Sequence, residues 1–199
     1  MDEIEIRGKI NRGEFEKLTA FLSQNAKLID EYNRLTVDAS PGFDPKARNW
    51  DQINKKLTNT QIDLRIKKSG RTEKIVVKVG YYSSKNRQEF EVDIKEGQFA
   101  NALMLCEALG FKANMIYRWK SRIYKYKDFE IKINEYPKSY YDWEIESLNS
   151  ESDPDGLAKE LSLHPFSDEE FREAINWKNH NLNELYSQEK VSEILKSFN

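Results

Sequence analysis

The stretch Glu3-Ile4-Glu5-Ile6-Arg7 decides how the rest of the chain is interpreted. Apolar and charged residues alternate strictly in it, and this period of two predicts a β-strand. Ile4 and Ile6 point to one face of such a strand, and the charged residues point to the other. Carboxylates two residues apart on one face repel each other unless a cation lies between them, a role open to Arg7 or a divalent metal. The plain alternative is a half-buried strand whose charged face meets water.

Composition bounds the possible functions. The chain has 199 residues, and 32 basic residues nearly balance 34 acidic ones, so bulk charge gives no argument for nucleic acid or membrane as a primary partner. Its one cysteine, Cys106, excludes an internal disulfide and a zinc cluster of cysteines. The sequence shows no signal peptide and no long apolar span, so we expect a cytoplasmic protein.

Hydrophobic periodicity predicts a strand-rich chain with intervening helices. The predicted strands cover residues 32–38, 61–68, 73–82, 87–94, 115–126, 129–135 and 140–147. The predicted helices cover residues 13–31, 97–110, 153–163, 167–178 and 188–198. Residues 39–60 contain Pro41, Gly42 and Pro45 and read as a loop, either a lid or a decoration without chemistry.

Nearly every predicted strand has one apolar face and one charged face. In the strand over 61–68, Arg65 and Lys67 share a face opposite Leu64 and Ile66. The same alternation places further polar residues together on their strands, namely Lys78, Arg87, Glu89, Glu91, Arg118, Lys120, Arg122, Lys132, Asn134, Glu144 and Glu146.

Two geometries fit this pattern. In one, an open antiparallel sheet turns its charged faces to water beneath the helices. In the other, the sheet closes with the charged faces inward and the helices outside, which removes the sheet edges. Buried charge must be paired or bound to a ligand, so inward cations suit phosphates and inward carboxylates suit a metal. The Glu pairs at both ends of the charged set favour closure.

The chain resembles the CYTH family, also called triphosphate tunnel metalloenzymes. The resemblance covers essentially the whole chain and rests on the order of its motifs: Glu3-x-Glu5-x-Arg7, Leu64-Arg65-Ile66-Lys67, Lys78, Arg87-x-Glu89-x-Glu91, Leu109-Gly110-Phe111, Lys120-x-Arg122, Glu144-Ile145-Glu146 and a closing segment over 155–186. That family includes class IV adenylate cyclases, thiamine triphosphatases and inorganic triphosphatases.

The resemblance implies an α+β fold with a closed eight-stranded antiparallel tunnel and helices outside. It implies one domain over 1–199, with the tunnel elements in 1–150 and a C-terminal helical segment in 151–199. The implied ligands of Mg²⁺ or Mn²⁺ are Glu3, Glu5, Glu89, Glu91, Asn134, Glu144 and Glu146. The implied catalytic cations are Arg7, Lys78 and Lys120, and the implied substrate-binding residues are Arg65, Lys67, Arg87, Arg118, Arg122 and Lys132.

Two positions depart from the family pattern. Arg7 stands where the family has Lys, and arginine does not readily lose a proton, which bears on any role that needs a neutral amine. Asn134 stands at the usual Asp, and its amide can coordinate a metal but brings no negative charge.

These observations predict metal-dependent hydrolysis of a small triphosphate-containing molecule by a monomer or homodimer. The first alternative is a class IV type adenylate cyclase, which needs a base pocket that no stretch of the sequence clearly supplies. The second is a non-catalytic binder of polyphosphate or nucleotide, which Arg7 and Asn134 would suit.

Overall fold

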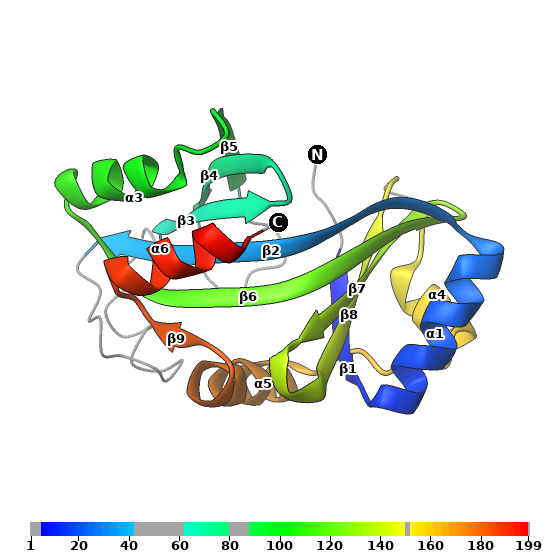
Figure 1. Cartoon of the computed structure of the whole chain (residues 1–199). Helices are drawn as coiled ribbons and strands as arrows, with labels where there is room; N and C mark the ends of the chain where they lie inside the picture. The colour runs from blue at the N-terminus through cyan, green and yellow to red at the C-terminus, as the bar shows by residue number, and fades with distance from the viewer. Residues whose placement is uncertain (1–4, 42–61, 80–87, 150–151, 199) are drawn as a thin grey trace. The chain divides into compact units, whose positions relative to one another are not determined.

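A computed structural model describes residues 5–41, 62–79, 88–149 and 152–198 (Figure 1). These residues form an α+β fold with nine strands and five α-helices. The strands are β1 (Glu5–Ile10), β2 (Lys27–Pro41), β3 (Ile62–Ser69), β4 (Thr72–Val79), β5 (Gln88–Ile94), β6 (Phe111–Tyr126), β7 (Phe129–Tyr136), β8 (Tyr140–Ser147) and β9 (Glu184–Leu185). The helices are α1 (Arg12–Asn25), α3 (Phe99–Ala108), α4 (Pro154–Glu160), α5 (Asp168–Asn181) and α6 (Gln188–Ser197).

The strands form an antiparallel sheet in the order β1-β8-β7-β6-β2-β3-β4-β5, and β9 pairs with β6. The predicted antiparallel α+β class is therefore confirmed. Within the described ranges the order ends at β1 and β5, and no pairing joins these two strands. The sheet is thus not closed, and the closed tunnel stays a prediction. No described helix is both long and apolar enough to cross a lipid bilayer.

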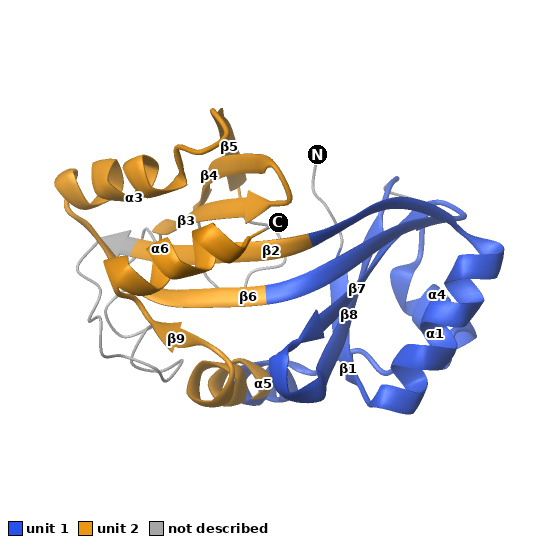
Figure 2. Cartoon of the chain, viewed as in Figure 1, with its two compact units in different colours: residues 1–32, 119–173 blue, residues 33–118, 174–199 orange. Residues whose placement is uncertain are grey.

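The chain divides into two compact units (Figure 2). Unit 1 contains residues 1–32 and 119–173, and unit 2 contains residues 33–118 and 174–199. The long strands β2 and β6 contribute residues to both units. Each unit has its own hydrophobic core, so we describe each by itself.

Unit 1 buries the apolar faces of β1, β7 and β8 against helix α1. Ile6 on β1 and Ile145 on β8 lie directly opposite each other, and both are buried. Helix α1 begins at a capping box, in which Asn11 accepts from the Glu14 amide at 3.0 Å and its own amide donates to Glu14 at 2.7 Å. The helix then contributes the buried residues Phe15, Leu18 and Leu22 to the core. Strand alternation and helix capping together fix this layer.

Unit 2 buries the apolar face of the β3–β4 hairpin against helices α3 and α6. Leu64 and Ile66 are at most 6% exposed, and they share a core with Phe99 of α3 and Val191 of α6. The predicted hairpin and the predicted helices over 97–110 and 188–198 are confirmed, with α3 and α6 slightly shorter at their ends. The opposite face of this hairpin therefore remains available for the charged residues.

The predicted helix over 13–31 is wrong in its last six residues. Helix α1 ends at Asn25, Ala26 is extended, and β2 already begins at Lys27. Leu28 is 49% exposed, so it adds nothing to the α1 core face. Backbone pairing along the long strand β2 satisfies these peptide groups instead, and such tertiary context overrides local helical spacing.

Three smaller differences concern the element boundaries. The predicted loop over 39–60 begins later, because residues up to Pro41 belong to β2, and its remainder from residue 42 lies outside the described residues. The predicted helix over 153–163 is the shorter α4. The two-residue strand β9 was not predicted, since a strand of this length has no periodicity of its own.

The close packing around β1 requires a glycine at position 8. We expect a larger residue there to lower the stability of the fold. A Cβ atom at Gly8 would overlap the carbonyl oxygen of His164 and lie 2.7 Å from the Trp143 ring. We therefore expect Gly8→Ala to lower the free energy of unfolding by about 1–3 kcal/mol, measured by urea denaturation. The matched control is Gly13→Ala in the first turn of α1, where the nearest atom is 3.4 Å away. Equal stability of both variants would contradict this close approach.

Candidate functional site

The polar face of unit 1 gathers carboxylates from three neighbouring strands. Glu5 of β1 lies opposite Glu146 of β8, which in turn lies opposite Glu130 of β7. Two residues along, Glu144 of β8 lies opposite Arg7 on β1 and Lys132 on β7. We call these six residues the carboxylate cluster: Glu5, Arg7, Glu130, Lys132, Glu144 and Glu146. Cross-strand partners share a sheet face, so all six lie on the side opposite the Ile6 and Ile145 core.

The two cations of the carboxylate cluster are already engaged. Lys132 Nζ lies 2.8 Å from Glu146 Oε2 and 3.2 Å from Glu130 Oε1. Arg7 Nη2 lies 2.5 Å from Glu5 Oε1. Four carboxylates thus face two cations, all partly buried or half-exposed. The cluster carries an excess of negative charge when every group is ionised.

This excess charge appears in the protonation of Glu5. Burial is the main cause that raises the pKa of Glu5 to about 7, and the charge of Glu144 raises it further against Arg7 and Lys132. Burial alone would lower the pKa of Lys132, but Glu144, Glu146 and Glu130 raise it far above its ordinary value. Glu5 therefore holds its proton more tightly than an isolated glutamate does.

The donor chemistry of this cluster fits a divalent cation. Glu5 and Glu144 are close enough to share a side-chain hydrogen bond, and a hard cation between two carboxylates would replace that shared proton. Within the described ranges, no three His, Cys, Asp or Glu residues are already grouped as a metal site. Glu3, the third predicted ligand on this strand, lies outside those ranges. Glu5, Glu144 and Glu146 are thus the residues that would hold Mg²⁺ or Mn²⁺.

Asn134, predicted as a metal ligand, belongs to a buried polar network. Its Nδ2 donates to Asp142 Oδ1 at 2.9 Å, and its Oδ1 accepts from Ser121 Oγ at 2.6 Å. All three residues are at most 5% exposed. Both ends of the amide are therefore in use, and its predicted metal contact would require one of these hydrogen bonds to break.

The polar face of unit 2 carries cations and carboxylates together. Lys67 on β3 lies directly opposite Lys74 on β4, and Lys78 lies opposite Asp63. Arg65 lies opposite Asp38 on β2 and, with Nε and Nη2, donates to both oxygens of Asp63 at 2.9 and 2.8 Å. We call the cations of this surface the cationic face: Arg34, Arg65, Lys67, Lys74 and Lys78. The register places five carboxylates on the same surface, namely Asp38, Asp63, Glu89, Glu91 and Asp93. Among these charges, Lys67 and Lys74 are like charges directly opposite each other, a pairing that by itself is destabilising.

Glu89 of β5 is the counter-ion that Lys67 and Lys78 share. It forms an ion pair with Lys78 and lies 3.6 Å from Lys67 Nζ. Even so, burial lowers the pKa of Lys67 to about 8, and the charges of Arg65, Arg34 and Lys78 contribute to that lowering against Glu89. A multiply charged anion would relieve this crowding. Burial likewise raises the pKa of Asp38 to about 6, with Asp63 adding to the effect and Arg65 opposing it.

The predicted cations of β6 lie elsewhere. The β6–β7 register places Arg122 opposite Ile133 and Ser121 opposite Asn134. Arg122 and Lys120 therefore lie on the core side of the sheet, where both contact Glu31 of β2 at 2.8 and 2.5 Å. The expectation that they share a face with Lys132 is wrong, because the turn after Tyr126 fixes the register and a one-residue offset reverses the faces. Their predicted phosphate contact stays untested.

The remaining predicted residues divide into three cases. Arg118 forms an ion pair with Glu184 of β9 at 2.6 Å. Glu91 is exposed and forms an ion pair with Lys74 at 2.6 Å. Arg87 lies outside the described residues. Sequence reasoning missed Glu130, although its spacing of two from Lys132 would have placed it on the same face.

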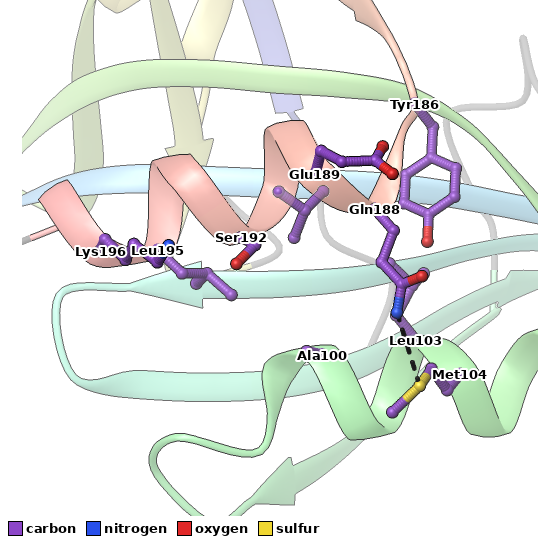
Figure 3. Close-up of a pocket in the computed structure, with 10 residues that line it drawn as sticks. Ala100, Leu103, Met104, Tyr186, Gln188, Glu189, Ser192, Leu195 and Lys196 are labelled. Atoms are coloured by element: carbon purple, nitrogen blue, oxygen red, sulfur yellow. Dashed lines mark hydrogen bonds between the residues drawn. The ribbon is translucent and has the colours of Figure 1, made fainter.

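A separate cavity of about 580 Å³ lies on the helical side of unit 2 (Figure 3). Its walls are α3 and α6, and Leu103, Met104, Val191 and Leu195 supply most of its apolar lining. Gln188 Nε2 lies 3.8 Å from Met104 Sδ across it. The strands turn their apolar side to these helices, so this cavity is on the opposite side of the sheet from Lys67 and does not suit a polyanion.

No protein-family model matches the chain, and no curated protein matches it in sequence. Its fold does match solved structures. A protein of Pyrococcus horikoshii is 20% identical with a TM-score of 0.58, over 84% of this chain and 93% of that one. A provisionally named adenylate cyclase of Vibrio parahaemolyticus is 12% identical with a TM-score of 0.54, over 97% and 98% of the two chains.

A third structure carries a statement about activity. It is a provisionally named adenylyl cyclase of Hippeastrum, described as having a dominant triphosphatase activity. It is 12% identical to this chain with a TM-score of 0.53, over 86% of this chain and 94% of its own. At identities of 12–20% these comparisons establish a shared fold, and the chemistry must be argued from this chain's own residues.

The raised pKa of Glu5 predicts a specific pH dependence of stability. A carboxyl whose pKa is higher in the folded state stabilises the fold while protonated, and this contribution is lost as the pH rises from about 4.5 through about 7. We therefore expect Glu5→Gln to be more stable than the wild type at pH 8 by about 1–3 kcal/mol, and nearly equal at pH 4.5.

Urea denaturation with EDTA present, from pH 4.5 to 8.5, measures this difference. Glu16→Gln on the exposed surface of α1 is the matched control and should give a small difference that does not grow with pH. If Glu5→Gln instead loses stability at pH 8, the ionised Glu5 carboxylate stabilises the fold without a metal.

Proposed function

We propose that this protein is a CYTH-type enzyme that hydrolyses a triphosphate-containing molecule with Mg²⁺ or Mn²⁺. The observation that carries the proposal is the excess of carboxylates in the carboxylate cluster of unit 1, where Glu5, Glu130, Glu144 and Glu146 face Arg7 and Lys132. In unit 2, the neighbouring cations Arg65, Arg34 and Lys78 act on Lys67, although carboxylates lie on the same face. A divalent cation is the ligand that would offset the first excess, and a phosphate oxygen is an anion that Lys67 and its neighbours could bind.

The residues of the cationic face would bind the phosphate chain. Lys67 and Lys78 now share Glu89, and a phosphate oxygen can replace that carboxylate as their anion. Arg65 is held by both oxygens of Asp63, which fixes its guanidinium as a rigid donor. These side chains thus orient the substrate before reaction, and orientation with charge neutralisation provides most of the acceleration in phosphoryl transfer.

The carboxylates of the carboxylate cluster would bind the metal, and their negative charge would offset its positive charge. Glu5, Glu144 and Glu146 are its candidate ligands, and Lys132 and Arg7 keep those carboxylates positioned. When bound, Mg²⁺ or Mn²⁺ would neutralise phosphate oxygens as negative charge develops on them. Lys132 is held between Glu146 and Glu130 and stays protonated, so it would contribute a fixed positive charge to the same surface.

Hydrolysis ranks before cyclisation in this proposal. Both reactions use the same charged groups, but a cyclase must also aim a ribose hydroxyl at the α-phosphorus. Provisional adenylate cyclases share the fold, so the cyclase is the second candidate. Closure of the sheet into a tunnel belongs to the proposal too, and the strand pairing of the described residues does not establish it.

The direct test is product analysis with purified full-length protein. We expect phosphate release from tripolyphosphate, thiamine triphosphate or ATP in the presence of Mg²⁺ or Mn²⁺, and none after chelation with EDTA. Cyclic AMP with pyrophosphate from ATP would favour the cyclase instead. Ligand-dependent thermal stabilisation without any product would indicate a binder.

Lys78→Ala and Glu144→Gln test the assigned residues. Each removes one charge from the proposed machinery, so we expect each to lower kcat/KM by about 10²–10³-fold. Arg12→Ala is the matched control, because it removes an exposed cation whose ion pair is with Glu16 on the same helix, α1. Near-normal turnover by both site variants would contradict the assignment, provided that thermal denaturation shows both to be folded.

A further inference from the structure

Arg65 of β3 lies between two carboxylates on the polar face of unit 2. Its Nε and Nη2 donate to Asp63 Oδ1 and Oδ2 at 2.9 and 2.8 Å. Asp38 of β2 lies opposite Arg65 in the strand register, with its Oδ1 3.5 Å from Arg65 Nε. One guanidinium charge therefore faces two carboxylates, and the Asp63 and Asp38 side chains are only 5% and 17% exposed.

The two carboxylates are held unequally. Asp63 accepts two hydrogen bonds from Arg65, whereas Asp38 Oδ1 meets Arg65 Nε as an ion pair at 3.5 Å. Asp38 Oδ1 is buried and has no hydrogen-bond partner among the described residues. A buried, ionised oxygen without a donor is costly, and protonation of the carboxyl lowers that cost. Asp38 is thus the member of the pair that can lose its charge with the smaller loss of contacts.

The charged and titratable neighbours of Asp38 come from its own strand and from the strands around it. Cations among them favour the ionised form of Asp38, and the negative charge of Asp63 opposes it. These neighbours are Arg34 on β2, Arg65, Asp63 and Lys67 on β3, and Tyr117 on β6, with Lys78 of β4 opposite Asp63 and Glu89 of β5 paired with Lys67.

Asp38 is close to its point of titration at neutral pH. Burial is the largest cause that raises the pKa of Asp38 to about 6, and the charge of Asp63 raises it further. Arg65, a hydrogen bond with Tyr117, and Lys67 lower the pKa. At pH 7, about a tenth of such a carboxyl carries a proton. A moderate change in the nearby charge is therefore enough to change its protonation.

A polyphosphate beside Arg65 would make this change in two ways. Its negative charge would repel an ionised Asp38. It would also compete for the charges of Arg65 and Lys67, which now stabilise the ionised form. Both effects favour the neutral acid. Protonation of Asp38 would thus make room for a bound anion without breaking the two hydrogen bonds that hold Arg65 to Asp63.

We infer that Asp38 takes up a proton from the solvent when a polyphosphate binds to the cationic face, so that pH controls the affinity of this surface. The inference rests on the proposed function, because it requires phosphates to bind beside Arg65. It adds a proton-linked binding step to that function, and no bond to phosphorus forms or breaks in this step. Asp38 acts on binding and has no part in the reaction at phosphorus.

The test measures proton uptake by calorimetry of the full-length protein, with tripolyphosphate as the probe and EDTA present to prevent turnover. Titrations at pH 7 in two buffers of different ionisation enthalpy give the number of protons taken up. We expect the wild type to take up about 0.4–0.8 more protons than Asp38→Asn. Asp128→Asn is the matched control, because it removes an exposed carboxylate from the turn between β6 and β7, and it should behave like the wild type.

The pH profile of the affinity separates this role from a structural one. The amide in Asp38→Asn has the shape of the protonated acid and cannot ionise. We therefore expect Asp38→Asn to bind tripolyphosphate about 10- to 50-fold more tightly than the wild type at pH 8, and about equally at pH 5. A variant that only disturbed Arg65 would bind more weakly at both pH values. In the wild type, the carbon-13 signal of the Asp38 carboxyl should titrate at higher pH in the tripolyphosphate complex than in the free protein.

The outcomes are distinct. Equal proton uptake by the wild type and Asp38→Asn, or weaker binding by Asp38→Asn at both pH values, overturns the inference but leaves the proposed function intact. Thermal denaturation shows whether Asp38→Asn is folded, and the carboxyl titration of the wild type decides the question if it is not. Failure of the wild type to bind tripolyphosphate, with EDTA and also with Mg²⁺, overturns the proposed function itself.

Discussion

The structure of unit 1 depends on the register of the β1–β8–β7 ladder. Because side chains alternate with a period of two, this register sends Ile6 and Ile145 into the core and Glu5 and Glu144 to the polar face. A slip by one residue would bury carboxylates among isoleucines at a cost that no local interaction could offset. Core packing and the placement of the carboxylate cluster are therefore one constraint, and the site cannot be moved without unfolding the layer beneath it.

The same alternation places one strongly perturbed group on the polar face of each unit. In unit 1, burial and a second carboxylate raise the pKa of Glu5, whereas in unit 2 burial and neighbouring cations lower the pKa of Lys67. Both groups have neighbours of like charge on their own sheet face, which does not improve folding. Groups perturbed in this way are typical of functional sites, where a ligand supplies the missing charge.

The shared fold limits the function less than the side chains do. The solved structures that share this fold are 12–20% identical to this chain and establish the fold alone. Within this chain, the chemistry depends on residues such as Glu5 and Lys67, whose charged side chains lie on the polar strand faces of their own units.

The sequence by itself determined the local structure, because period-two alternation and helix capping act over a few residues. It predicted that Glu5 and Ile6 lie on opposite faces of their strand, and that Leu64 lies in the core and Arg65 on the polar face. It also predicted most strand positions. Only the tertiary structure decided which polar faces coincide. Arg122 lies with Glu31 on the core side because the β6–β7 turn sets its register, and Trp119 meets Tyr136 for the same reason. Such cross-strand relations depend on partners distant in sequence, which no single stretch encodes.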